Sequence, residues 1–442
     1  MKSFISNIQH DSLLKRVKTM VFCVLPLSLA ACSSSMDESD TAKIVTPNTT
    51  PGAFYTGEYR NAFVEFGIAS PEKVSRKVND TYKQLFYSSS RSENGKSVFF
   101  PVGQDMGFIK DIGSNDIRSE GMSYGMMIAV QMNDQAMFNK LWKFSKTYMQ
   151  HKEGWYKDYF AWHLNPDAPF AHKSENPAPD GELYFAMALF FAEHRWGAGE
   201  GINQYKVEAN RILQAMVNKP ETDSQVTMFS RDEKQILFVT EKSLGIYTDP
   251  SYHVAAFYEL LGRWADQDKQ LWLDAAKVSR DYLYNASHPK TGLFSEYAAF
   301  DGTPQITSFN DISHKSGYDA HRVIGNMAMD NHWFNVDPRQ QELADRMIGF
   351  FTNEYARKGQ NYAVHEMDGA IASKWASSGQ NAMNGTAAMI TASSEAQEFT
   401  ERLWDQAVPT GKWRYYDGVL YMFSVLQMSG EYKIYGPTDA VK

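Results

Sequence analysis

The feature of this chain that most restricts its fold is a series of segments whose apolar residues recur every three or four positions. Such spacing is typical of α-helices that bury one face. Several segments are apolar nearly all round, which predicts burial on both sides, while others are amphipathic. The segments are residues 124–149, 181–196, 250–264, 271–286, 318–334, 340–356, 396–406 and 418–430. Their alternation predicts an all-α fold with two concentric layers of helices.

Strand patterns are scarce in the same sequence. The best candidate is QILFVT at residues 235–240, which predicts a small β-hairpin at the rim of the helical layers. From residue 53 to the end at residue 442, no polar, low-complexity stretch separates one part from another. We therefore expect residues 53–442 to form one domain, and its length allows a sizeable core.

The N-terminus has the pattern of a bacterial export signal. Basic residues at positions 15–18 precede the apolar run MVFCVLPLSLAA, which is too short for a stable membrane span but fits a signal-peptide core. The run ends in Leu-Ala-Ala-Cys at Cys32, which resembles a lipobox. We expect residues 1–31 to be a lipoprotein signal peptide and Cys32 to be lipidated. An ordinary signal peptide that ends near a cysteine is the alternative.

Residues 32–52 are polar and predict a flexible tether between the lipid and the domain. Ser33, and not Asp, follows Cys32, which favours an anchor in the outer membrane if the source is Gram-negative. The expected location is thus the bacterial cell envelope, on the periplasmic or the outer face.

Charge and cysteine content exclude several other classes. The net charge of -8 argues against a nucleic-acid partner. Both cysteines precede the domain, which leaves it no disulfide and no thiolate metal site. His314, His321, His332 and His365 have none of the short spacings of metal ligands, and no Walker or Rossmann glycine pattern is present. We expect a monomer without metal or cofactor.

Acidic residues stand at the starts of several predicted helices. Glu120 lies in SEGMSYGMM, Asp180 in APDGELYF, and Asp319 in YDAHRV. Helix capping explains any one of them. If alternate helices form an inner ring, however, these openings meet at one end, together with many aromatic residues. Carboxyl groups beside aromatic rings are what cleavage of a glycosidic bond requires.

Four blocks in order carry a family resemblance: SEGMSYGMM, APDGELYFAMAL, TDPSYHVAAFYE and YDAHRV. With the closing TGKWRYYDGVLYMFSVLQMSG, they resemble glycoside hydrolase family 8, and most closely its xylan-active branch of endo-xylanases and reducing-end xylose-releasing exo-oligoxylanases. The resemblance implies that residues 53–442 form a catalytic (α/α)6 barrel, with the cleft at the inner-helix ends. It also implies an inverting mechanism on xylan or xylo-oligosaccharides.

The same resemblance assigns roles to individual residues. Glu120 matches the general acid, Asp319 the general base, and Asp180 the acid that positions and distorts the sugar. Arg322, one helical turn after Asp319, is placed to pair with a neighbouring carboxylate. Further candidate substrate contacts are Tyr124, Trp162, Tyr252, His253 and Tyr318, although a buried ring is the ordinary explanation of each.

The position of Glu120 raises a physical question. A helix N-terminus stabilises a carboxylate, whereas a general acid must hold its proton. Desolvation by surrounding rings, or repulsion from a second acid such as Asp180, would oppose the helix dipole. The sequence does not distinguish the two causes.

The sequence predicts the substrate less specifically than it predicts the family. Asp319 stands where chitosanases of the family have Asn, and the APDGELYF and TDPSYH blocks favour xylan over cellulose. The exo-acting members close the cleft with a Leu-His-Pro stretch, which residues 364–389 lack, although Lys374 and Trp375 could provide bulk. Endo and exo action both remain open.

Other functions stay as alternatives. The family also includes β-1,4-glucanases (cellulases) and chitosanases. A surface lipoprotein that binds glycans without cutting them would not need both Glu120 and Asp319. A polysaccharide lyase would instead use a Tyr, His or Arg set to abstract a proton.

Overall fold

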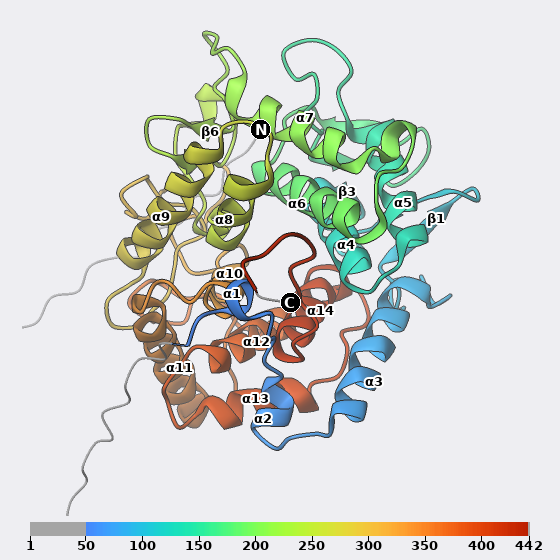
Figure 1. Cartoon of the computed structure of the whole chain (residues 1–442). Coiled ribbons are helices and arrows are strands. Elements are labelled where there is room, and N and C mark those ends of the chain that lie inside the picture. The colour runs from blue at the N-terminus through green and yellow to red at the C-terminus, as the bar shows by residue number, and fades with distance from the viewer. Residues whose placement is uncertain (1–49, 441–442) are drawn as a thin grey trace, which may run out of the picture. The chain divides into compact units, whose positions relative to one another are not determined.

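The centre of the fold is a ring of helices that are buried on nearly every side (Figure 1). The computed structural model describes residues 50–440, and within them six helices form this ring: α4 (Ser119–Gln131), α6 (Pro179–Trp196), α8 (Ala255–Trp264), α10 (His321–Trp333), α12 (Ser378–Thr386) and α14 (Arg414–Met428). Each contacts the next along the chain, and α14 contacts α4, so the ring closes. The predicted signal peptide, Cys32 and most of the predicted tether lie outside the described residues.

A second layer of helices surrounds the ring (Figure 1). One of them, α3 (Pro71–Tyr82), packs on α14. The others each pack on the inner helix that precedes them: α5 (Gln135–Phe144), α7 (Tyr205–Asn218), α9 (Lys269–Ala286), α11 (Arg339–Lys358) and α13 (Ala396–Asp405). Short helices α1 (Ala53–Thr56) and α2 (Ala62–Glu65) precede α3.

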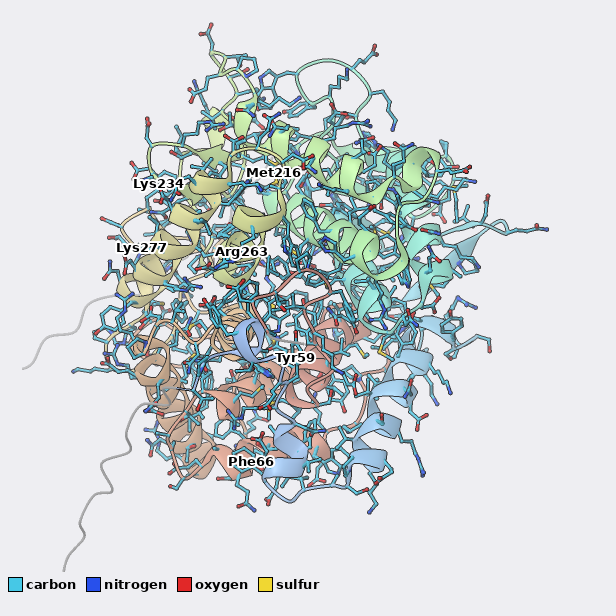
Figure 2. The ribbon with its side chains drawn as sticks, in the orientation of Figure 1. Tyr59, Phe66, Met216, Lys234, Arg263 and Lys277 are labelled. Carbon is cyan, nitrogen blue, oxygen red and sulfur yellow. The ribbon has the colours of Figure 1, made fainter. Side chains whose placement is uncertain are left out.

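The outer helices are amphipathic because one face of each packs on the inner layer and the other faces solvent. In α9, Trp272, Ala275, Ala276 and Ser279 are buried against α8 at helical spacing. Lys277 lies on the opposite, exposed face (Figure 2). In α4, by contrast, every residue except Glu120 is buried. The predicted two-layer (α/α)6 barrel is therefore confirmed, and side chains fill its interior (Figure 2).

The prediction of one continuous helical pattern over residues 124–149 is wrong at its centre. The inner helix α4 ends at Gln131, and the outer helix α5 begins at Gln135. Between them Asn133 adopts a positive φ of 60°, and the Asp134 side chain accepts a hydrogen bond from the amide of Met137. This cap starts α5 and lets the chain reverse from the inner to the outer layer.

Short strands decorate the barrel. The expected hairpin near residues 235–240 is present as β6 (Phe229–Ser230) and β7 (Gln235–Ile236). A second antiparallel hairpin joins β1 (Phe99–Val102) and β2 (Met106–Ile109). A three-stranded sheet has the order β3 (Ile117–Arg118), β4 (His163–Leu164) and β5 (His172–Ser174).

The inner helices begin at a common end of the barrel. Arg322 in the first turn of α10 contacts Glu120 at the start of α4 and Asp180 at the start of α6. Asp417 in the first turn of α14 accepts a hydrogen bond from Gly379 at the start of α12. The loops before these helices therefore gather at one face.

Among the described residues, no helix combines the length and apolar character needed to cross a bilayer.

Candidate active site

A single arginine joins the acids at the helix starts. Arg322 is 4% exposed, and its Nη1 donates to Glu120 Oε2 and to Asp180 Oδ2, both at 2.8 Å. Its Nη2 donates to Asp319 Oδ1 at 2.9 Å and to Asp249 Oδ2 at 3.5 Å. Residues far apart in the sequence thus meet at one guanidinium. We call this group of Arg322 and its acidic partners the acidic cluster.

The structure brings together the acids that the sequence nominated and adds Asp249. This residue is fully buried in the loop before α8, and its Oδ1 accepts a hydrogen bond from the amide of Ser251 at 2.6 Å. Through this bond Asp249 caps the 3-10 turn at Pro250–Tyr252. Its second oxygen faces Arg322, and only the fold shows that.

The acidic cluster contains more negative than positive charge. One guanidinium cannot neutralise several carboxylates in a buried space, so protons are retained. Burial raises the pKa of Asp180 to about 7, against the opposing attraction of Arg322 and with repulsion from Glu120 and Asp319. Burial also raises the pKa of Asp249 well above its usual range, and repulsion from Asp319 adds to the effect.

Glu120 behaves as a buried acid. Burial is the main cause that raises its pKa, and repulsion from Asp319 adds to it, while Arg322 and the hydroxyl of Tyr415 act in the opposite direction. Tyr415 donates to Glu120 Oε1 at 2.6 Å. The question of what opposes the helix dipole thus has an answer: desolvation first, then a neighbouring acid, which is Asp319.

Asp319 is more exposed than its partners, with 27% of its side chain accessible against 15% for Glu120 and 6% for Asp180. The most accessible carboxylate is the one that solvent water reaches most easily. Of these acids, Asp319 is therefore the one placed to activate water, and Glu120 is the one placed to hold a proton.

A further acid, Glu296, supports the loop that carries Asp319. It is 2% exposed, and its Oε1 accepts the backbone N–H of Tyr318 at 2.7 Å, while Oε2 accepts from Asn310 Nδ2 at 2.6 Å. Burial, with repulsion from Asp319, raises its pKa to about 8. Nothing in its sequence block, LFSEYAAF, distinguished Glu296 from a surface acid.

Two predicted tyrosines lie against the acidic cluster. The Tyr124 hydroxyl accepts from Arg322 Nη1 at 3.0 Å, and the ring of Tyr252 lies 5.6 Å from the Arg322 guanidinium. Both side chains are buried, at 4% and 5% exposure. They hold the arginine, and they leave little surface for a sugar.

Trp162 and Tyr318, unlike Tyr124 and Tyr252, expose part of their side chains to solvent. Trp162 is partly exposed; its ring stacks on His163, and its carbonyl accepts the amide of Ser119, next to Glu120. Tyr318 is 37% exposed and precedes Asp319. Both rings therefore lie in segments adjoining the acidic residues, where sugar faces can pack.

His253 does not reach the site, so its prediction as a substrate contact is wrong. It is 0% exposed, its ring nitrogens bond Thr248 Oγ1 at 2.9 Å and Ser279 Oγ at 3.0 Å, and its ring stacks on Tyr282. Burial lowers its pKa to about 3. It is a neutral core histidine that ties the loop before α8 to α9.

Two exposed tryptophans near the helix starts were not among the predicted contacts. Trp375 is 55% exposed and donates its indole N–H to the Tyr318 hydroxyl at 3.0 Å. Trp413 is 65% exposed and directly precedes α14. A tryptophan at or within three residues of the start of an inner helix is the sequence signal that would have identified both.

Fold and site together define a class of protein. A barrel of paired helices presents, at the inner-helix starts, a desolvated acid with a raised pKa, a more accessible carboxylate and exposed aromatic rings. That combination is the machinery of a glycoside hydrolase. The chain matches the family model for glycosyl hydrolases family 8 over residues 93–430, and it belongs to that family.

Relatives within the family are similar over most of their length. The chain is 40% identical over 398 residues to the reducing-end xylose-releasing exo-oligoxylanase Rex8A of Paenibacillus barcinonensis, covering 88% of this chain and 99% of that one. A family 8 xylanase of Teredinibacter turnerae, solved as a catalytic mutant with xylohexaose, is 38% identical with a TM-score of 0.82, covering 86% and 99%. Endoglucanase C of Ruminiclostridium cellulolyticum is 22% identical over 432 residues, covering 95% and 84%.

Proposed function

We propose that this protein hydrolyses β-1,4-xylosidic bonds in xylan or xylo-oligosaccharides with inversion at the anomeric carbon. The observation that carries the proposal is the pair formed by Glu120 and Asp319, which contact different nitrogens of Arg322. One acid is desolvated with a raised pKa, and the other is accessible to water. An inverting hydrolase needs this division of roles.

In the proposed reaction, Glu120 gives its proton to the glycosidic oxygen as the bond to the anomeric carbon breaks. Asp319 takes a proton from a water molecule, whose oxygen attacks that carbon from the opposite face. Glu120 ends ionised and Asp319 protonated, and exchange with solvent restores both. Asp180, fixed by Arg322 beside Glu120, is placed to hydrogen-bond the sugar at the point of cleavage and to favour its distortion.

The substrate assignment rests on the relatives. The chain is far more similar to the xylose-releasing enzyme than to the endoglucanase, at 40% against 22% identity. A β-1,4-glucanase or a chitosanase is the second candidate. Purified protein on xylohexaose, cellohexaose and chitosan hexamer, under one set of conditions, should release product fastest from xylohexaose. Faster release from either of the other two would contradict the xylan assignment.

Stereochemistry tests the mechanism separately from the substrate. We expect proton NMR, within minutes of mixing, to show the α-anomer first, because water attacks a β-linked sugar from the opposite face. First release of the β-anomer would indicate a covalent intermediate, and Asp180 would then be the suspected nucleophile.

Further contacts to the sugar chain, or to the residues that hold it, are proposed for Tyr124, Trp162, Tyr252 and Tyr318.

Endo and reducing-end exo action remain alternatives, and Trp375 bears on the choice. The segment that carries it is joined to the Asp319 loop by the bridge between Ser316 and His365, and by the Trp375–Tyr318 hydrogen bond. The bulky indole of Trp375 thus lies beside Tyr318, which directly precedes Asp319 in the chain. Xylose and xylopentaose as the first products from xylohexaose would identify exo action. Xylobiose with xylotetraose, or xylotriose, as first products would identify endo action.

We also propose that Cys32 is lipidated and anchors the domain in the cell envelope, in the outer membrane of a Gram-negative source, through a tether ending near residue 52. The proposal rests on the lipobox-like LAAC sequence. Metabolic labelling with a fatty-acid analogue should mark the wild type and not a Cys32→Ala variant, which should become soluble. An unlabelled wild type would contradict the anchor.

We also propose that the protein is a monomer. Gel filtration of the soluble Cys32→Ala variant would test this.

A further inference from the structure

A group of possible metal ligands lies outside the acidic cluster. His151, His172 and Glu175 each offer one ligand atom, and these atoms lie within 4.8 Å of one another. His151 follows the π-helical turn η2 (Ser145–Met149), His172 begins β5, and Glu175 directly follows β5. Sequence spacing does not predict this group, because His151 stands far from the His172-Lys-Ser-Glu175 motif.

The two imidazoles are oriented as metal ligands usually are. His151 Nε2 lies 2.8 Å from the backbone oxygen of Glu175, and His172 Nε2 lies 2.7 Å from the backbone oxygen of Tyr148. A carbonyl oxygen can only accept, so each Nε2 carries the hydrogen. Each Nδ1 can then present a lone pair. A ligating histidine almost always donates its other N–H to such a partner.

Both Nδ1 atoms face the same carboxylate oxygen. His172 Nδ1 lies 2.7 Å and His151 Nδ1 lies 3.6 Å from Glu175 Oε2. Tetrahedral zinc, bonded to nitrogen and oxygen at about 2.0–2.1 Å, holds neighbouring ligand atoms roughly 3.3 Å apart. A modest shift of the exposed Glu175 side chain would bring both distances to that value.

We propose that His151, His172 and Glu175 form a binding site for a divalent transition metal of the zinc type. The Glu175 side chain is 63% exposed, against 11% for His151 and 22% for His172, so water can complete the coordination. Two nitrogens and one carboxylate suit zinc, whereas calcium and magnesium prefer oxygen ligands.

The site would connect two segments that lead to the catalytic face. His151 is fixed by its backbone bonds with Tyr159 and Asp158. Glu175 is followed by Asn176, whose carbonyl accepts the amide of Trp162, and the chain then enters α6 with Asp180. A bound metal would fasten the turn after η2 to the end of β5. Its expected role is to stabilise these loops and not to take part in the cleavage step.

The test begins by treating the full domain with a chelator and then removing the chelator. Zn²⁺ is then added, and its effect on thermal unfolding is measured. At a Zn²⁺ concentration about a hundredfold above its dissociation constant, the Tm should rise by about 3 °C. Titration calorimetry should give one site per chain. Mg²⁺ and Ca²⁺ should produce no comparable shift.

Variants locate the effect. Glu175→Gln keeps the shape of an exposed side chain, and together with His172→Ala it should abolish the shift. His194→Ala removes an exposed histidine elsewhere, and Glu120→Gln removes a carboxylate from the acidic cluster; both should keep the shift. An unchanged Tm in the wild type with Zn²⁺, or a shift that survives the combined Glu175→Gln and His172→Ala changes, would overturn the proposal, and its loss in Glu120→Gln would place the metal in the acidic cluster instead.

Discussion

Helix α10 contributes to two buried ion clusters, one near each end, and their charge balance differs. At its start, Arg322 alone faces the carboxyl groups of Glu120, Asp180, Asp249 and Asp319. About 12 Å further along the axis, Asp330 binds Arg280, with Asp330 Oδ1 2.7 Å from Nη2 and Oδ2 2.8 Å from Nε.

The cluster around Asp330 is balanced. Arg280 Nη1 lies 2.8 Å from Glu259 Oε1, and Glu259 Oε2 lies 2.5 Å from Arg263 Nη1. Arg263 lies on α8, where Figure 2 labels it. Two guanidinium groups thus face two carboxylates. We call this the paired cluster. Its bonds tie α8, α9 and α10 together.

The comparison shows how similar residues give either structure or chemistry. In the paired cluster each carboxylate has its own cation, so the charges compensate one another. In the acidic cluster the acids share one cation, and burial raises the pKa of Glu120 and of Asp180. The acidic cluster therefore holds protons in the pH range where a general acid is needed, at a cost in stability.

The largest expected effect is the loss of the proton donor or of the base. Glu120→Gln and Asp319→Asn should each lower turnover on xylohexaose by about two to four powers of ten. Both amides keep the side-chain shape, so the Tm should stay close to that of the wild type. Asp330→Asn, the matched change in the paired cluster, should leave turnover of the folded enzyme within about twofold. Near-normal turnover of Glu120→Gln would contradict the assignment.

The next effect concerns stability and should appear at the other end of α10. Asp330→Ala leaves Arg280 buried with half of its partners, and breaking such a pair costs about 3–5 kcal/mol of unfolding free energy. Denaturant unfolding would measure the loss. Turnover per folded molecule should be retained. A stability loss below about 1 kcal/mol would mean that the paired cluster does not carry the structural role assigned to it.

A smaller effect depends on pH. The folded-state pKa of Asp180, about 7, exceeds its ordinary value of 3.8, so this group contributes stability that is complete below about pH 4 and is lost as the pH rises through 7. Asp180→Asn does not titrate. Its Tm relative to wild type should therefore rise between pH 4 and 7 and then level off.

Glu296→Gln provides a second test of this pH effect, at a higher pH. Because the pKa of Glu296 is raised to about 8, the relative Tm of this variant should keep rising to about pH 8 before it levels. Thermal unfolding across pH 4–9 measures both curves. A constant difference from wild type in either variant would show that the replaced acid has the same pKa in the folded and unfolded states.

The smallest effect concerns the exposed rings. Trp375→Ala should lower kcat/KM on xylohexaose by about two- to tenfold, the value of one aromatic contact, and should shift the ratio of xylose to longer products. Trp413→Ala is the control at the start of α14: it should reduce kcat/KM without the same shift in products. Chromatography of the products measures both. Identical product ratios in wild type and both variants would remove Trp375 from the question of endo or exo action.

Helical periodicity predicted much of the barrel. The segment at 181–196, apolar nearly all round, became inner helix α6, and the amphipathic one at 271–286 became outer helix α9. Helix α12, with the sequence SGQNAMNGT, was not predicted, because glycine and asparagine disfavour isolated helices. A Cβ at Gly385 would lie 3.0 Å from the Leu403 side chain, so the close packing of α12 on α13 favours glycine there although glycine disfavours an isolated helix.

The site residues also fall into two groups: those that local sequence features predicted and those that only the fold brings to the site. Sequence blocks nominated Glu120, Asp180, Asp319 and Arg322, because acids at helix starts and a family pattern are local features. They did not identify Tyr415, which donates to Glu120 from 295 positions away, or Glu296, which holds the Tyr318 amide. His253 was nominated by its block and lies in the core.

The sequence by itself determined the layers of helices, the acids at their starts and the family, since periodicity, capping and motifs depend on residues close together in the chain. Only the tertiary structure decided which acids share a cation. Closing the ring buries Asp180 and Asp249 around Arg322, leaves Glu120 mostly covered and leaves Asp319 more open. Desolvation and charge repulsion depend on distances through space, and these distances set which acid keeps its proton and which one meets water.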